Sequence, residues 1–197
     1  MSSAATIQED TKRARILEGA MTVFLAYGFQ RTTMDDIART AQVSRPALYL
    51  LFRNKTDIYR ALAKEFMEEC TAQARVALAE DRPLAERLEA AVSCVFDKLL
   101  EVEQSPHGAE ILDMKSSLAS DIVSAGRGAM GQMIERAIGD EMLRLGVDLS
   151  SRDLSAGILG DMLLDAIDGL KMRGVAGEPL RNATRQYIRI LVDTLHD

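Results

Sequence analysis

Two helix-start patterns only eleven positions apart limit what this chain can fold into more than any other feature of its sequence. Thr33 followed by Asp36 has the form of a capping box, in which the side chain of each residue satisfies a backbone N–H of the other. Ser44 is a favourable N-cap and Pro46 suits a first turn, so a second helix begins directly after Val43. Both helices are therefore short, and helices joined by so tight a turn cross steeply instead of lying antiparallel.

The rest of the chain also repeats its apolar residues at the helical period. One such stripe consists of Ile16, Ala20, Val23, Phe24 and Tyr27, and Gly28 follows it at the position that ends a helix. Gly126, Gly128 and Gly131 weaken the helix expected around them, which is either kinked or interrupted there. No alternating run of β-branched residues is long enough for a strand. We therefore expect an all-α fold of about nine helices, in which a three-helix helix-turn-helix head precedes a helical bundle.

Three regions are expected along the chain. Residues 1–10 are small and polar and form a flexible tail, without the basic start or the apolar stretch of a signal peptide. Residues 11–60 form the head, with its helix-turn-helix at about 33–52, and residues 61–197 form the helical body. Through residue 60 the chain carries nine Lys and Arg against six Asp and Glu, whereas the remainder carries 15 against 24. A basic head on an acidic body suits a protein that presents one end to a polyanion.

The second short helix has an inner and an outer side. Leu48, Leu51 and Phe52 point inward, whereas Arg45, Pro46 and Tyr49 share the outward side. The steep crossing projects the first turn of this helix out of the protein, where it can enter a DNA major groove. Arg45 can read guanine or hold a phosphate, and Tyr49 can donate to a phosphate oxygen. Lys55, at the start of the next helix, and Thr33, on the other flank, are expected to hold backbone phosphates.

A resemblance to a known family rests on the same residues. The run TxxxIAxxAxVSRPALYLLFRNKxxIYRAL, with the preceding FLAYGFQRTTMDDIA, resembles the DNA-binding head of the TetR family over residues 11–60 and more loosely beyond them. The resemblance implies that Arg45–Leu51 is the recognition helix and that Thr33, Ser44, Tyr49 and Lys55 touch phosphates. The full set expected at the DNA is Thr33, Ser44, Arg45, Pro46, Ala47, Tyr49, Leu50 and Lys55.

The chain departs from the family's pattern at two positions. Leu50 and Leu51 stand where the family often has tyrosine or histidine, which removes polar donors from the edge of the recognition surface. Leu51 fits the core, and Leu50 either meets a thymine methyl group or makes no base contact. The same departure leaves open a second class of function, a helical ligand-binding or adaptor protein that has lost specific DNA binding.

The C-terminal part of the chain is expected to form a homodimer interface. Between Leu154 and Leu170 apolar residues surround most of the helix and leave only a narrow strip of Asp161, Asp165 and Asp168, so this helix is buried on two sides. Paired with their copies, helices at about 152–173 and 179–196 would make a four-helix interface with two-fold symmetry, as the resemblance also implies. Such a dimer suits a double-stranded operator that is palindromic or nearly so. The alternative is one large monomeric core.

The body also offers material for a small-molecule site. Ten methionines suit an irregular apolar pocket, although methionines are more often ordinary core filler. The resemblance implies a small, often apolar effector that loosens the DNA-bound form. The residues expected to line its site are Met67, Cys70, Phe96, Met114, Met133 and Met162. The residues do not identify the effector, and a repressor is favoured over an activator by the family alone.

Catalysis and metal binding have little support in the sequence. Only His107 and His196 are available for a nucleophile–base pair, and there is neither a Gly-rich phosphate loop nor a metal motif. His107, Glu110 and Asp113 are more typical of helix-start charges than of a ligand set. The two cysteines, Cys70 and Cys94, lack redox-motif spacing. We therefore expect a cytoplasmic, non-enzymatic regulator without a cofactor or a membrane span.

Overall fold

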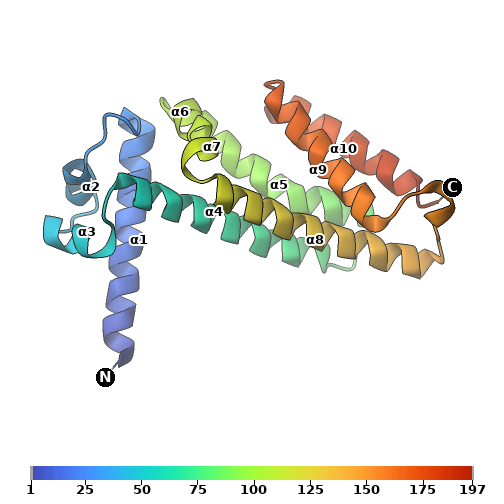
Figure 1. Cartoon of the computed structure of the whole chain (residues 1–197), viewed down its shortest axis with the longest axis horizontal. Helices are drawn as coiled ribbons and strands as arrows, with labels where there is room; N and C mark the ends of the chain where they lie inside the picture. Colours follow the sequence, from blue (N-terminus) through green and yellow to red (C-terminus); the bar gives the residue numbers. More distant parts are fainter. Residues whose placement is uncertain (1, 197) are drawn as a thin grey trace. The chain divides into compact units, whose positions relative to one another are not determined.

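The computed structural model describes the backbone of residues 2–196 and, within it, the side chains of residues 8–115 and 117–196. This part of the chain contains ten α-helices, one 3-10 helix and no strand (Figure 1), which confirms the all-α prediction. The elements are α1 (Ser2–Tyr27), α2 (Met34–Thr40), α3 (Arg45–Leu51), α4 (Lys55–Leu78), α5 (Leu84–Glu103), α6 (Gly108–Asp113), α7 (Lys115–Leu118), α8 (Ser120–Leu145), η1 (Ser150–Arg152), α9 (Ala156–Met172) and α10 (Gly177–Asp193).

The chain divides into two compact units, each made of segments that are distant in the sequence. Met1–Met67 and Glu101–Val123 form the first, called the head unit, and Glu68–Leu100 and Ser124–Asp197 form the second, called the body unit. The sequence places one boundary near residue 60, so it misses the second segment of the head unit. α1 also extends back to Ser2, over residues that the sequence predicts to be a tail.

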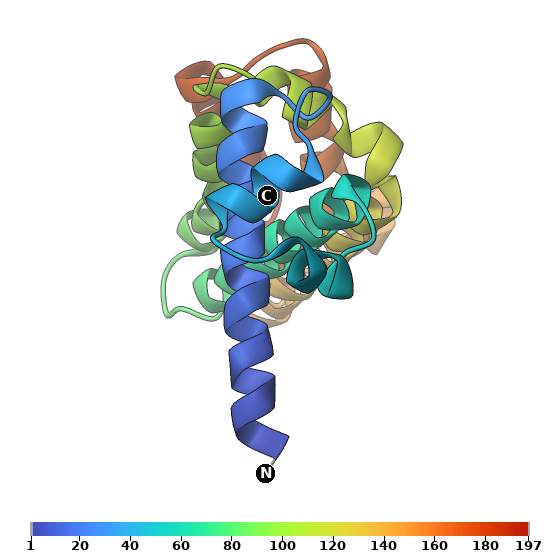
Figure 2. The same cartoon turned by 90° about the vertical axis from the view of Figure 1, so that its left-hand side faces the viewer.

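The head unit is built on the apolar face of α1, against which α2 packs, and α3 packs in turn on α2 (Figure 1 and Figure 2). Its completely buried side chains include Ile16, Phe24, Ile37, Leu48 and Ile58. α1 and the end of α2 approach closely at Gly19, where a Cβ atom would lie 2.8 Å from the backbone nitrogen of Ala41. Only glycine therefore fits at this crossing.

The turn between α2 and α3 is held by α1. The Arg15 guanidinium donates to the backbone oxygens of Ala41 and Gln42, both at 2.8 Å. Gln42 adopts a left-handed backbone with a φ of 53°, a conformation that favours glycine or asparagine. Arg15 satisfies the two carbonyls that the end of α2 leaves open, so the turn is stabilised without a glycine.

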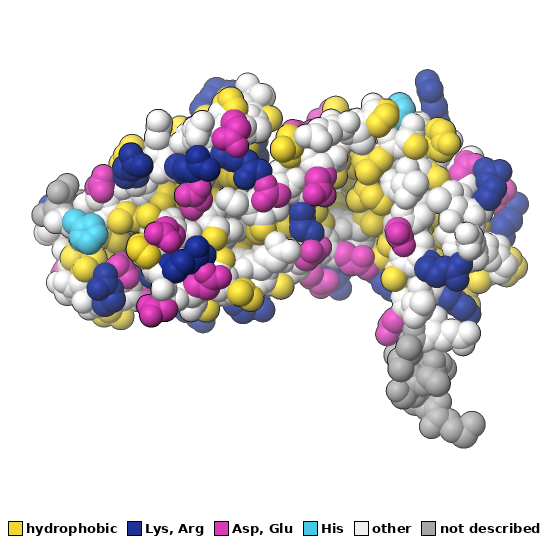
Figure 3. Space-filling model, turned by 180° about the vertical axis from the view of Figure 1, so that it is seen from behind, with side chains coloured by type: hydrophobic (Ala, Val, Ile, Leu, Met, Phe, Trp, Pro, Cys, Tyr) yellow, Lys and Arg dark blue, Asp and Glu magenta, His cyan; other side chains and the backbone are white. Residues whose placement is uncertain are grey.

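The body unit buries the facing sides of α5, α8, α9 and α10. Leu88 of α5, Ile134 and Ile138 of α8 and Ile188 of α10 are at most 2% exposed. α8 is continuous from Ser120 to Leu145, so Gly126, Gly128 and Gly131 do not interrupt the helix. On the face drawn in Figure 3, acidic and basic side chains are interspersed over this unit and do not gather into a patch of one sign. None of the helices in the described residues has the length and apolarity that a membrane crossing requires.

Candidate nucleic-acid interface

Both short helices of the head begin at the caps that the sequence predicts. At α2 the Asp36 N–H donates to the Thr33 hydroxyl at 3.2 Å, and the Thr33 N–H donates to the Asp36 carboxylate at 3.0 Å. The hydrogen bond from the Thr33 hydroxyl is the largest cause that lowers the pKa of Asp36. At α3 the Ala47 N–H donates to the Ser44 hydroxyl at 3.3 Å, and a proline occupies the first turn. The capping box and the second helix start are therefore confirmed.

The exposure of α3 separates an inner from an outer side. Leu48 and Phe52 are buried and Leu51 is half-buried, as predicted. Tyr49 is 46% exposed and Leu50 is 83% exposed, so Leu50 lies on the surface with no place in the core. The other outward residues are Arg45 and Pro46, which are exposed, and Ala47, which is half-buried. The exposed apolar side chain of Leu50 thus lies on the same helix as the polar side chains of the first turn.

Arg45 forms an ion pair with Asp35 of the neighbouring helix α2, a residue that no pattern in the sequence indicated. Its Nε lies 2.8 Å from a carboxylate oxygen of Asp35, and both side chains are more than half exposed. Asp35 occupies the first turn of α2, and its distance from Arg45 depends on how α2 and α3 cross. The ion pair uses one edge of the guanidinium and leaves both terminal nitrogens available to another partner.

Lys55 serves the head in a different way from the one predicted. Its ammonium group donates to the backbone oxygens of Phe29, Gln30 and Thr32 at 2.7, 3.0 and 3.1 Å. It also lies 4.6 Å from the centre of the Phe29 ring. An ammonium has three donors, and all three are used here. Lys55 therefore fixes the loop before α2. Its ammonium group could donate to a phosphate oxygen only by giving up a hydrogen bond to one of these carbonyls.

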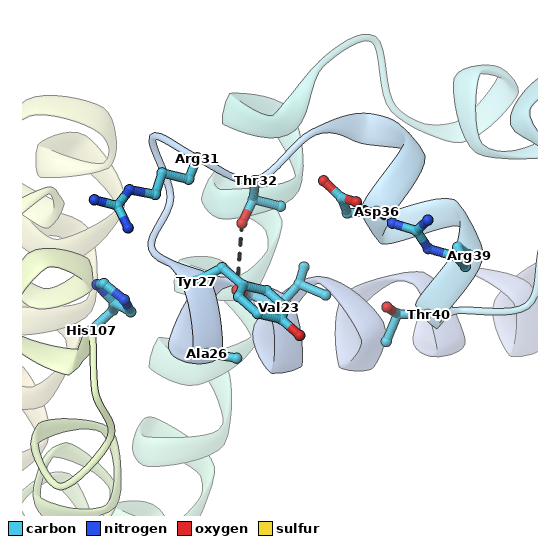
Figure 4. A pocket seen from close by; sticks show the side chains of 9 residues that line it. All are labelled: Val23, Ala26, Tyr27, Arg31, Thr32, Asp36, Arg39, Thr40 and His107. Atoms are coloured by element: carbon cyan, nitrogen blue, oxygen red, sulfur yellow. Dashed lines mark hydrogen bonds and ion pairs between the residues drawn. The ribbon is translucent and has the colours of Figure 1, made fainter.

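A polar cavity of about 540 Å³ lies beside α1 and α2 within the head unit (Figure 4). Its lining consists of Val23, Ala26, Tyr27, Arg31, Thr32, Asp36, Arg39, Thr40 and His107. Asp36 and Arg39 form an ion pair across one wall. Nothing in the sequence predicted this cavity, because its residues come from three separate segments. Its polar lining also differs from the apolar effector site that was expected in the body.

Glu110 of α6 ties this second segment of the head unit to the end of α1. Its carboxylate accepts from the Gln30 N–H at 3.2 Å and lies 3.5 Å from Nδ1 of His107. The backbone N–H of His107 donates to the backbone oxygen of Leu25 at 3.2 Å. Glu110 thus contacts the loop after α1, which its helix position alone did not indicate. Among the described residues no cluster of side chains suits a metal ion.

The side chains predicted to line an effector site do not all share one environment. Cys70 and Phe96 are buried and Met133 is half-buried in the body unit, whereas Met114 packs against the core of the head unit. Met67 is half-buried at the end of the first head segment. Met162 is 58% exposed on α9. The expectation of an interior position is therefore wrong for Met162, because the buried side of α9 is formed by the neighbouring leucines.

A second exposed surface lies on the last two helices, called here the α9/α10 face. Ile158 and Met162, one turn apart on α9, are 44% and 58% exposed, and Ile190 on α10 is 63% exposed. α9 and α10 pack directly on each other. Large apolar side chains that remain exposed on two adjacent helices are typical of a surface that another protein covers.

The head is thus a helix-turn-helix, in which two short, capped helices expose the first turn of the second. Residues 16–62 match the family described as "Bacterial regulatory proteins, tetR family". The match to this family covers the head of the chain, as the resemblance in the sequence predicted.

Known proteins resemble this chain at two levels. The transcriptional activator FasR of Mycolicibacterium smegmatis is 34% identical over 91 residues, which are 46% of this chain and 42% of FasR, so the match spans less than half of that relative. The fatty acid degradation regulator FadR of Bacillus halodurans has a TM-score of 0.65 at 17% identity, covering 91% of this chain and 94% of that one. The Thermus thermophilus repressor FadR, solved with lauroyl-CoA, has a TM-score of 0.60 at 21% identity, covering 91% and 93%. The two structures share the fold of this chain.

Proposed function

We propose that this chain is a sequence-specific DNA-binding transcriptional regulator that binds a palindromic operator as a homodimer. The observation that carries the proposal is the exposed outer side of α3, where Arg45 and, one turn later, Tyr49 lie on a helix fixed from within by the buried Leu48. A first turn presented in this way fits the major groove, where each base pair offers a distinct pattern of donors and acceptors. The family match over residues 16–62 supports the same function.

Arg45 is the proposed reader of a guanine, and Asp35 positions it. The Asp35 carboxylate lies beside Nε, and the two terminal nitrogens of Arg45 would donate together to O6 and N7 of one guanine. The ion pair also limits the rotamers of a long exposed side chain, which lowers the entropy that binding would cost. Asp35 is therefore proposed as a specificity residue that acts through Arg45.

The remaining outward residues are proposed to position the head on the duplex. The hydroxyls of Tyr49 and Ser44 can donate to phosphate oxygens. Thr33 donates its hydroxyl to Asp36, so a phosphate would have to displace this bond. The exposed Leu50 can contact a thymine methyl group. Lys55 would contribute mainly by holding the loop that precedes Thr33. Phosphate contacts of this kind fix register, whereas Arg45 and Leu50 would carry the sequence preference.

The α9/α10 face is proposed to pair two chains. A single head covers only a few base pairs, and two half-sites must lie about 34 Å apart or a multiple of it. Two copies of the α9/α10 face would form a four-helix interface with two-fold symmetry. The exposed Ile158, Met162 and Ile190 would then be covered by the partner.

A small apolar molecule in the body unit is the proposed effector. Cys70, Phe96 and Met133 supply apolar and polarizable surface there. Because the Thermus thermophilus FadR structure contains lauroyl-CoA, this compound is the first one to test. Release of the operator by the effector would relieve repression, the mode of regulation that the family resemblance favours.

Selection from a random double-stranded DNA library, followed by fluorescence anisotropy across a salt series, tests this function. We expect an inverted-repeat site, saturation at two chains per site and a steep loss of affinity with salt. Arg45→Ala should weaken binding about 10- to 100-fold and relax the preference at one guanine, since a bidentate contact discriminates by about 1–3 kcal/mol. Asp35→Asn should relax the same preference while changing total affinity less.

Arg75→Ala provides a matched control, because Arg75 is an exposed arginine on α4 outside the head unit. It should leave the preferred sequence and its affinity unchanged. A selection that returns no preferred sequence would overturn the proposal, and so would an equal effect of the two arginine variants. The ligand-binding or adaptor function would then take its place.

A further inference from the structure

α4 and α5 form an antiparallel pair joined by residues 79–83 (Figure 1), and polar contacts fix their register. Near the connection, Arg87 donates to the last carbonyl of α4 at 3.1 Å. Farther along, the Lys98 ammonium lies 2.5 Å from a carboxylate oxygen of Glu69. Between these contacts, Sγ of Cys94 lies 3.6 Å from the backbone oxygen of Cys70 and 3.2 Å from that of Ala91 on its own helix. The register thus sets the two cysteines of the chain opposite each other.

The two thiols meet where the side chains of both helices are small. Ala74, one turn after Cys70, and Ala91, one turn before Cys94, are completely buried, as is Cys70 itself. Small residues let helices approach closely, which a disulfide requires because it spans roughly 4.4–6.8 Å between Cα atoms. Sγ of Cys94 lies 3.6 Å from the backbone oxygen of Cys70, which places the two residues side by side on the paired helices.

The surroundings make the two thiols chemically unequal. The hydrogen bond from the Cys70 thiol is the main cause that lowers the pKa of Cys94, and Lys98 acts in the same direction. The same hydrogen bond and burial raise the pKa of Cys70. Cys94 is also partly exposed, whereas Cys70 is buried. Cys94 therefore has the character of an attacking thiolate, and Cys70 that of the thiol that stays protonated until it reacts.

We propose that Cys70 and Cys94 are a redox modification site, at which a hydroperoxide converts them into a reversible disulfide between α4 and α5. The Cys94 thiolate attacks the peroxide, its sulfur takes one oxygen as a sulfenic acid, and the other oxygen leaves as water after taking up a proton. The Cys70 sulfur then attacks the Cys94 sulfur, the S–O bond breaks, and the Cys70 proton leaves with the hydroxyl group as a second water. The two thiols lose two electrons in total, and the peroxide gains them.

The site is separate from the DNA-binding and dimer surfaces proposed above, and it shares Cys70 with the proposed effector site. Neither cysteine lies on α3 or on the α9/α10 face, so the disulfide neither requires DNA binding nor blocks dimer formation. α4 continues without a break from the head unit into the body unit. A bond at Cys70 would fasten this helix to α5 and restrict its movement. The Lys98–Glu69 ion pair already joins the same two helices beside the thiols.

Intact mass and peptide mapping without reductant, on the reduced full chain treated with hydrogen peroxide, test the site. The wild type should lose two hydrogens and give one linked peptide pair containing Cys70 and Cys94, and dithiothreitol should restore both thiols. Cys70→Ala should instead hold a sulfenic acid at Cys94, which dimedone traps. Cys94→Ala should give no such adduct at Cys70. Circular dichroism checks that both alanine variants fold.

Lys98→Gln separates a tuned thiol pair from two ordinary cysteines. It keeps both sulfurs and should slow the alkylation of Cys94 several-fold, because a cation beside the thiolate is lost. The proposal would be overturned if both thiols of the wild type stayed free at a peroxide concentration that oxidises the Cys70→Ala variant. Disulfides that form only between two chains would also overturn it. So would oxidation of Cys94 to a sulfinic acid without a bond to Cys70.

Discussion

Gly28 ends α1 in a conformation and in a space that admit no side chain. Its φ is 83°, and a Cβ atom there would lie 2.5 Å from the Glu110 carboxylate and 3.1 Å from Nδ1 of His107. Gly28→Ala would therefore strain the backbone and displace Glu110 from the Gln30 N–H. We expect a loss of about 2 kcal/mol in the free energy of unfolding, measured by urea denaturation.

Gly128→Ala is the matched control for that substitution. Gly128 lies within α8, and a Cβ atom there would meet nothing within 4 Å. Because alanine is the better helix former, this variant should be as stable as the wild type or more stable by up to about 1 kcal/mol. Equal losses in the two variants would mean that neither the positive φ of Gly28 nor the position of Glu110 accounts for the effect.

The hydrogen bonds of Lys55 indicate a structural role for this residue more directly than a contact with phosphate. Lys55→Met keeps the apolar stem but removes the three hydrogen bonds to Phe29, Gln30 and Thr32. We expect the thermal midpoint to fall and the free energy of unfolding to drop by about 2 kcal/mol, since partly buried carbonyls lose a charged donor. Lys12→Met, at an exposed position of α1, should leave both unchanged. An unaltered stability of Lys55→Met with weaker DNA binding would restore the phosphate role.

At the residue scale, sequence patterns predicted the interactions that join residues close together in the sequence. The caps at Thr33 and Ser44 join residues three positions apart, so their spacing alone identifies them. The bonds of Lys55 join residues 23 to 26 positions apart, and the pairing of Arg45 with Asp35 depends on a crossing angle. Neither has a pattern in the sequence. The left-handed backbone of Gln42 was missed because it is not a glycine.

Between elements, Glu141 of α8 is the most enclosed carboxylate with a partner on another helix in the described residues. It is 8% exposed and accepts from Arg87 of α5 at 3.3 Å and from Arg144 at 2.6 Å. The hydrogen bond from Arg144 is the main cause that lowers the pKa of Glu141, and burial opposes it. A carboxylate of lowered pKa stabilises the fold above its unfolded pKa and loses this contribution as the pH falls through its folded pKa.

Glu141→Gln should lower the free energy of unfolding at neutral pH by about 3 kcal/mol, because the enclosed guanidinium of Arg87 loses its counter-charge. The difference from the wild type should shrink as the pH falls below 4.5, the ordinary pKa of this group, since the wild-type carboxylate is then protonated as well. Urea denaturation at a series of pH values measures both effects. Arg144→Ala removes the more exposed partner and should cost less than about 1 kcal/mol. A pH-independent difference would contradict the assignment.

The periodicity of the sequence predicted the order and type of the elements. It did not predict which elements belong to the head unit and which to the body unit. The last two helices were expected at 152–173 and 179–196 and are found at Ala156–Met172 and Gly177–Asp193. The inclusion of 101–123 in the head unit depends on contacts such as the bond from the Tyr59 hydroxyl to the backbone oxygen of Ile111, at 2.7 Å. These residues are 52 positions apart, and no local pattern connects them.

For the molecule as a whole, the function that we propose requires two chains, and the α9/α10 face is the surface proposed to join them. Ile158, Met162 and Ile190 keep about half of their surface exposed although the other side of each helix is fully buried. Arg127 of α8 lies beside the acidic strip of α9, 2.8 Å from Asp168 and 2.5 Å from Asp165, so part of this charge is paired within one chain. The apolar residues of the face remain without a partner in the described part of a single chain.

Ile158→Glu with Met162→Glu should convert the dimer into a monomer while leaving each chain folded, because both side chains are exposed on one chain and would be enclosed only in the dimer. Enclosing two like-charged pairs across a two-fold axis should weaken self-association about 100-fold or more, measured by sedimentation equilibrium. Operator binding should weaken with it, while non-specific binding by one head persists. Val76→Glu changes an equally exposed apolar residue on α4 and should remain dimeric. A dimer that survives the double substitution would place the interface elsewhere.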